Sequence, residues 1–137
     1  MLGVNKYPQA FIDASRARVK AQVASYRKMQ KAAKSDSATA AFEPEFFNNM
    51  VIVLDSYFVH RLRGIEGKDG NPLNEVRMLC NSLVQNGGVM TADKTIRMKP
   101  ADTVLQYDFG DTIAVTAADF TRLADAYFAE IESKFAG

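Results

Sequence analysis

Residues 45–64 read EFFNNMVIVLDSYFVHRLRG, and this stretch decides the fold because its apolar residues surround most of a helical wheel. A helix that is apolar on nearly all sides belongs at the centre of a domain. We therefore expect the central, most buried helix over about residues 45–65. Its strongest core candidates are Phe46, Phe47, Met50, Val51, Leu54, Phe58 and Leu62.

A long helix is predicted before it, over about residues 8–34. Pro8 fits the first helical turn, where its missing N–H costs little, and no helix breaker follows up to Lys34. Two rows of side chains on this helix can pack, so we expect a homo-oligomer. The apolar row is Phe11, Ile12, Val19, Val23, Tyr26 and Met29; the small row is Ala10, Ala14, Ala17, Ala21 and Ala24.

Turn residues mark the connections on either side of the central helix. The small and polar run SDSATAAFEP ends in a proline, so residues 35–44 are expected to be a linker. After the central helix, KDGNP predicts a turn, with Asn71 as N-cap and Pro72 at the first helical position. The next helix is predicted over about 72–86 and ends before Gly87.

The pattern changes after Gly88. KTIRMK, TVLQY and TIAV are short β-prone runs over about residues 94–115, separated by Pro100 and by DFGD at 108–111. Thr116 and Asp119 have the spacing of a capping box, so a final helix is expected over about 117–135. The predicted fold class is therefore α+β and mainly α. About four helices form a bundle, with a small antiparallel sheet or hairpin inserted before the C-terminal helix, as a single domain over 1–137.

Composition narrows the class of protein. A content of 47 % hydrophobic and 24 % charged residues is typical of globular chains. With one cysteine, Cys80, and one histidine, His60, the sequence excludes an intrachain disulfide and a structural zinc site, and we expect no metal and no cofactor. No apolar run approaches the ~20 residues that span a bilayer, so we expect a cytoplasmic protein without a membrane partner.

Charge is segregated along the chain. Residues 1–34 hold eight Lys/Arg and one acidic residue, whereas the remainder holds nine basic and 15 acidic residues. Five cations project within about 60° of arc on the N-terminal helix, and this basic stripe indicates an acidic protein partner or an acidic surface of the same chain. Nucleic acid is not favoured, because no aromatic residues are interleaved with the cations. The stripe is Arg16, Lys20, Arg27, Lys31 and Lys34.

Arg61 is the most unusual charged residue, because on the wheel of the central helix it falls among Leu54 and Phe58. A buried guanidinium needs a carboxylate, and Glu66, Glu75 or a residue of the last helix could supply it. The pattern leaves two interpretations open. Arg61 either forms an internal ion pair or grips an anionic ligand with its planar fork of donors.

Three further residues, His60, Glu75 and Arg77, are candidates for the same ligand site. His60 lies on a mixed stripe without an orienting carboxylate, since Asp55 projects to another side of the helix. Glu75 and Arg77 lie in the first turns of the 72–86 helix, where free N–H groups can receive an anion. A simpler explanation needs no ligand: Glu75 lies near the positive end of the helix, and Arg77 pairs with Glu75 or Asn74 or is free in water.

Two functional hypotheses follow. The first is a small non-enzymatic cytoplasmic domain that acts through protein partners or self-association. The alternative is a small-molecule or anion-binding protein, or an enzyme, with His60, Arg61, Glu75 and Arg77 lining a pocket. Convergence of those four side chains on one cavity would favour the alternative.

Overall fold

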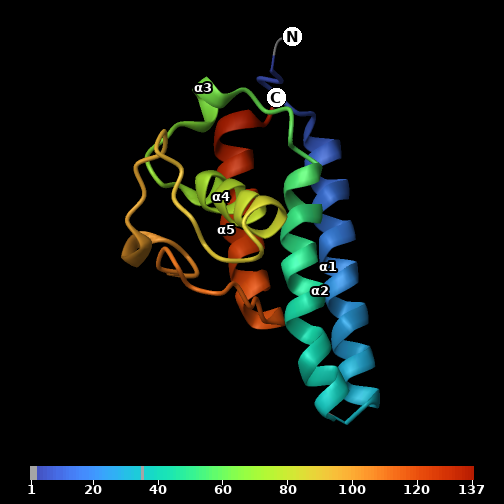
Figure 1. Ribbon diagram of the computed structural model, residues 1–137. Helices are drawn as coiled ribbons and strands as arrows, with labels where there is room; N and C mark the ends of the chain where they lie inside the picture. The colour runs from blue at the N-terminus through green and yellow to red at the C-terminus, as the bar shows by residue number, and fades with distance from the viewer. Residues whose placement is uncertain (1–2, 35) are drawn as a thin grey trace.

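The computed structural model describes residues 3–34 and 36–137, and the regular elements in these ranges are all helices (Figure 1). Met1, Leu2 and Ser35, which fall within the predicted domain and linker, lie outside the described residues. The helices are α1 (Gln9–Ala32), α2 (Ser37–Ser56), α3 (Arg63–Glu66), α4 (Pro72–Gln85) and α5 (Ala117–Phe135), with one 3-10 turn, η1 (Pro100–Asp102).

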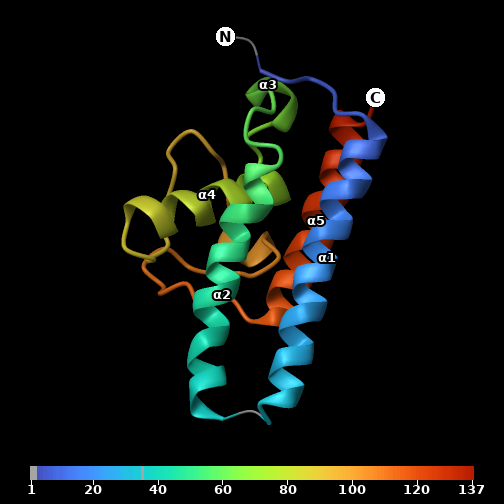
Figure 2. The same ribbon diagram turned by 90° about the vertical axis from the view of Figure 1, so that its right-hand side faces the viewer.

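Four of the helices surround one hydrophobic core. α1 and α2 form an antiparallel hairpin, α5 runs alongside α1, and α4 crosses the others at a steep angle (Figure 2). The end of α1 and the start of α2 project beyond the start of α5 in both views. The prediction that the second helix is the central and most buried one is wrong, because α5 packs against α1, α2, α3 and α4 and has more buried residues than α2. Phe47, Val51 and Leu54 of α2 are nevertheless fully buried.

The chain between α4 and α5 corrects the predicted fold class from α+β to all-α. No strand forms in residues 86–116, where η1, turns and one isolated bridge between Val89 and Thr112 replace the expected sheet. The β-prone runs were misread because side chains satisfy the backbone here. Asn48 of α2 donates to the Ile113 carbonyl and accepts from the Val115 N–H, and Ile113 and Val115 fill the core.

The predicted linker over 35–44 is also wrong, because α2 already begins at Ser37. The Asp36 carboxylate accepts from the Thr39 N–H at 2.8 Å and caps the helix. Pro44 lies inside α2, where its missing N–H removes only one intrahelical bond, to Ala40. The helix also ends earlier than predicted, at Ser56, and residues 57–60 form a turn before the short α3.

The starts of α4 and α5 agree with the sequence. The Asn71 side chain accepts from the Leu73 and Asn74 N–H groups, and Pro72 is the first helical residue. Thr116 accepts from the Asp119 N–H at 3.1 Å. Local capping chemistry therefore predicted both boundaries.

Residues 3–8, which we name the N-terminal strap, join distant parts of the chain. The Val4 N–H donates to the His60 carbonyl, and the Leu62 N–H donates to the Val4 carbonyl, both at 2.7 Å. On the other side, the Tyr7 N–H donates to the Phe135 carbonyl, and the Gly137 N–H donates to the Tyr7 carbonyl. The strap thus connects the end of α5 to the loop after α2.

Candidate functional site

Arg61 lies at the centre of a buried ionic cluster that we define as Asp55, Arg61, Glu66, Arg77 and Tyr127. The Arg61 side chain is 0 % exposed. Its NH1 donates to Asp55 at 2.7 Å and its Nε donates to Glu66 at 2.9 Å. The guanidinium also donates to the Tyr127 hydroxyl and to the Phe58 and Leu73 carbonyls, so it is surrounded by acceptors.

Glu66 is the acceptor that joins the two arginines of the cluster. Arg77 donates to it through Nε at 3.1 Å and NH2 at 2.6 Å, and the Asn74 amide donates at 2.7 Å. Burial of Glu66 opposes its ionisation, but the Arg77 hydrogen bond and the charges of Arg61 and Arg77 outweigh burial and lower the pKa of the carboxyl. Arg77 therefore pairs with Glu66, and not with Glu75 or Asn74 as we expected.

The expectation that Arg61 is buried and paired with a carboxylate is confirmed, although the wheel argument placed it on a helix that has already ended. Glu66 was among the predicted partners. Asp55 was missed, because the turn at residues 57–60 folds Arg61 back towards the last turn of α2. No helical projection shows that contact.

Glu75 lies outside the ionic cluster and serves a different segment. Its two carboxylate oxygens accept from the Val104 and Leu105 N–H groups, each at 2.9 Å. Burial raises the pKa of Glu75, and the two backbone hydrogen bonds only partly offset this. Glu75 therefore anchors the irregular segment after η1 to α4.

His60 is exposed, and its backbone carbonyl receives the Val4 N–H of the N-terminal strap. Of the four residues proposed from the sequence, Arg61 and Arg77 thus meet at Glu66, whereas Glu75 and His60 lie elsewhere. The four do not line a common cavity in the described part of the chain.

The basic stripe divides into two parts. Arg16 forms an ion pair with Glu132 of α5 and lies over the Phe128 ring, while Lys20 and Asp125 line a small cavity between α1 and α5. Arg27, Lys31 and Lys34 are exposed, and Lys34 follows the end of the helix. Only the first part of the stripe is matched by acidic residues of α5.

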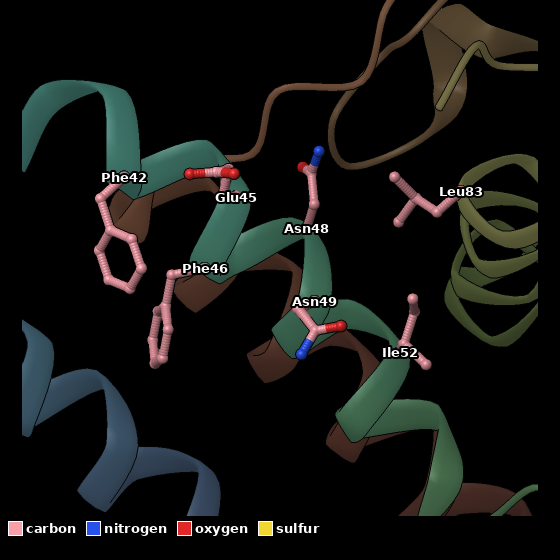
Figure 3. Close-up of a pocket in the computed structure, with 7 residues that line it drawn as sticks. All are labelled: Phe42, Glu45, Phe46, Asn48, Asn49, Ile52 and Leu83. Carbon is pink, nitrogen blue, oxygen red and sulfur yellow. The ribbon is translucent and has the colours of Figure 1, made fainter. Parts of the chain in front are cut away.

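A groove along α2 has a volume of about 510 Å³ (Figure 3). Leu83 of α4 points towards α2 on the side of Asn48 and Ile52. Aromatic rings line the other end of the groove. The lining residues are Phe42, Glu45, Phe46, Asn48, Asn49, Ile52 and Leu83.

A second hollow of about 250 Å³ lies beside the groove, since Ile52 lines both. Its rim carries the most exposed large apolar residue of the described chain, Val84, at 66 %, and also Val59. Asp55 and Arg77 reach its floor, but both already take part in the ionic cluster. We name the two hollows together the α2–α4 groove.

These features define a small all-helical domain with a closed internal ion cluster and an open apolar groove. No family model, curated protein or solved structure matches the chain. Across residues 3–34 and 36–137, no helix combines the length and apolar character required to cross a bilayer.

Proposed function

We propose that this chain is a non-enzymatic interaction domain whose α2–α4 groove receives an amphipathic helix of a partner protein. The observation that carries this proposal is the pair of neighbouring hollows along α2, whose lining leaves Phe42, Val59 and Val84 exposed. Apolar patches of this kind typically mark sites of protein association.

The shape of the groove supports a helical occupant. Phe42 to Ser56 of α2 are separated by fourteen helical steps, which correspond to about 21 Å at ~1.5 Å per residue. A partner helix of about four turns matches that length. Such a helix would place apolar residues at i, i+3 or i+4, and i+7 against Phe42, Phe46 and Ile52, with Leu83 and Val84 on the other wall.

Charge in the groove specifies the partner further. Asp55 and Arg77 are neutralised inside the domain, whereas Glu45 forms no ion pair among the described residues. We therefore expect a partner helix with an apolar face and a Lys or Arg at the end that lies over Glu45.

The alternative function, an anionic ligand held by Arg61, is less well supported. The guanidinium is enclosed, and two carboxylates and three further acceptors already occupy it. An internal ion pair accounts for Arg61 without a ligand.

A photo-crosslinking amino acid at Val84 tests the proposal in cells, with the same amino acid at the exposed Ala17 as control. A protein that crosslinks at Val84 and not at Ala17 is then purified, and its binding is measured by calorimetry. Ile52→Glu and Val84→Glu should each weaken binding at least about tenfold, while Ala17→Glu leaves it unchanged. Equal crosslinking at both positions, or binding that both groove variants retain, would reject the groove.

A further inference from the structure

The exposed cations at the end of the α1–α2 hairpin point to a second interaction, which does not depend on the groove. We propose that copies of this chain associate head to tail, with the basic hairpin end of one copy against an acidic turn of the next. The basic hairpin end is Arg27, Lys28, Lys31 and Lys34; the acidic turn is residues 108–111, and Asp102 lies earlier in the same segment between α4 and α5.

The basic hairpin end is uncompensated within its own helix. No acidic residue occurs between Asp13 and Asp36, and all four cations are exposed. None of them forms an ion pair within residues 3–34 and 36–137. The hairpin end projects beyond α5 (Figures 1 and 2). Glu132 of α5 neutralises Arg16, which lies nearer the start of α1.

The acidic residues near the hairpin end are already engaged by backbone groups. Asp36 caps α2, and the Glu43 carboxylate accepts from the Ala117 N–H at the start of α5. The four cations are consequently open to solvent and free to meet an acidic surface of another molecule.

The same chain carries such a surface. Residues 100–125 hold five aspartates and one basic residue, Arg122, which pairs with Asp119. Asp102, Asp108 and Asp111 are exposed. The turn is held in shape by the Asp108 N–H, which donates to the Asp111 carboxylate at 2.8 Å.

Apolar side chains accompany the charges on both surfaces. Phe109 is 44 % exposed between the two aspartates of the acidic turn, and Met29 and Phe42 are about equally exposed near the hairpin end. Their burial would add contact area to the charge match. This combination favours a protein surface over a polyanion, which offers no apolar counterpart.

Position in the fold determines the type of assembly. The acidic turn lies in the segment on the α4 side of the molecule, whereas α1 lies on the opposite side in both views (Figures 1 and 2). One molecule cannot join its own two surfaces, and each contact pairs two different surfaces. The contact is therefore heterologous and gives open chains or rings. It should be salt-sensitive, because exposed charges are screened over ~10 Å at 0.1 M salt.

Sedimentation velocity over a concentration series tests the association. At about 30 mM salt the average mass should rise above 15.1 kDa with concentration, and about 500 mM salt should restore the monomer. A monomer at every concentration in low salt would overturn the proposal.

Charge exchange tests the two surfaces directly. Arg27→Glu with Lys31→Glu gives one variant, and Asp102→Lys with Asp108→Lys gives another. Each should remain monomeric alone, whereas their equimolar mixture should associate, because the unchanged hairpin end of the second variant then meets the unchanged acidic turn of the first. A mixture that stays monomeric would overturn the proposal.

Two control variants separate this contact from other surfaces. Arg18→Glu with Lys94→Glu carries the same net charge as the first variant and should associate like the wild type. Ile52→Glu in the groove should also leave association unchanged. Loss of association in either control would assign the self-contact elsewhere and reject the head-to-tail arrangement.

Discussion

Burial of the Arg61 guanidinium costs desolvation free energy, yet its charge is needed to compensate buried carboxylates. Burial works against the charge of its guanidinium, yet Tyr127, Asp55 and Glu66 together raise its pKa. The net stability gained from such a buried pair is small, but removal of one partner leaves a charge without compensation. The main effect of removing Arg61 is therefore to leave a buried carboxylate without its positive partner.

Arg61→Ala should lower the free energy of unfolding by about 3 kcal/mol or more, because it removes packing and leaves Asp55 unpaired. Arg61→Met keeps the stem and should also destabilise, and a second change, Asp55→Asn, should recover much of that loss. Urea unfolding measures all three variants. Arg63→Met is the control, because Arg63 is largely exposed and lies 3.9 Å from Glu66.

The ligand hypothesis makes the opposite prediction for the same variants. If Arg61 faced a ligand cavity, Arg61→Met would leave the free protein stable and abolish stabilisation by an anion. Thermal melts with a panel of phosphates and carboxylates distinguish the two. If Arg61→Ala and Arg61→Met both melt within about 1 °C of the wild type and no ligand changes the melting temperature, Arg61 has neither the structural nor the ligand-binding role.

The raised pKa of Glu75 predicts that stability depends on pH with the opposite sign to the dependence from Glu66, whose pKa is lowered. Because the folded pKa of Glu75 is raised, its ionisation favours the unfolded chain, and stability is lost as pH rises from about 4.5 through the folded pKa. Glu75→Gln removes this loss but has one acceptor oxygen for two N–H groups, which costs about 1–3 kcal/mol. The deficit of Glu75→Gln relative to wild type should therefore narrow between pH 4 and pH 7, as measured by urea unfolding. A constant deficit would contradict burial as the cause.

At the scale of elements, sequence patterns predicted the helices that carry their own start signals. Asn71, Pro72 and Thr116 lie beside the positions that they cap, so short-range chemistry was sufficient. The sheet was predicted wrongly because Asn48 and Glu75, far away in the sequence, supply the hydrogen bonds that strands would have supplied. The ionic cluster was predicted in part, since Glu66 is near Arg61 in sequence but the contact with Asp55 depends on a turn.

The turn before α4 packs closely against the irregular segment between α4 and α5. Substitutions at two glycines can test how tight this contact is. Gly70 and Gly110 both have positive φ, at +88° and +99°, but a Cβ on Gly70 would lie 2.8 Å from the Arg97 carbonyl oxygen, whereas a Cβ on Gly110 meets nothing within 4 Å. Gly110→Ala should cost about 1–2 kcal/mol from backbone strain alone. Gly70→Ala should cost clearly more in the same denaturation assay. Equal losses of stability in the two variants would show that the irregular segment moves away from the added Cβ at no energetic cost.

At the scale of the whole molecule, the N-terminal strap contributes a buried aromatic side chain to the core. The Tyr7 ring packs edge-on against Phe58 at 4.9 Å, yet its buried hydroxyl has no hydrogen-bond partner among the described residues. Tyr7→Phe should therefore be neutral or stabilising, since it removes an unsatisfied polar group. Tyr7→Ala should cost about 3–5 kcal/mol. Calorimetric melting temperatures test both, and a destabilised Tyr7→Phe would reveal a partner for the hydroxyl.

Self-association, which the sequence suggested from two packable rows on the N-terminal helix, stays a prediction. The apolar row is largely used inside the molecule, where Ile12, Val19 and Tyr26 are buried, while the alanine row is exposed. Light scattering at micromolar concentration is the measurement. Assembly that persists in high salt and is lost in Ala17→Glu would assign the contact to the alanine row.

The strap also has a kinetic consequence. Its contact between Tyr7 and Ala136 closes a loop that includes nearly the whole chain, and its contact between Val4 and Arg61 closes a loop that includes α1 and α2. Loops of that length close late, after the local helical pairs have formed, and the strap should be absent from the folding transition state. Substitutions at Val4 and Tyr7 should then accelerate unfolding while the refolding rate hardly changes. The strap would act as a latch that sets the lifetime of the native state.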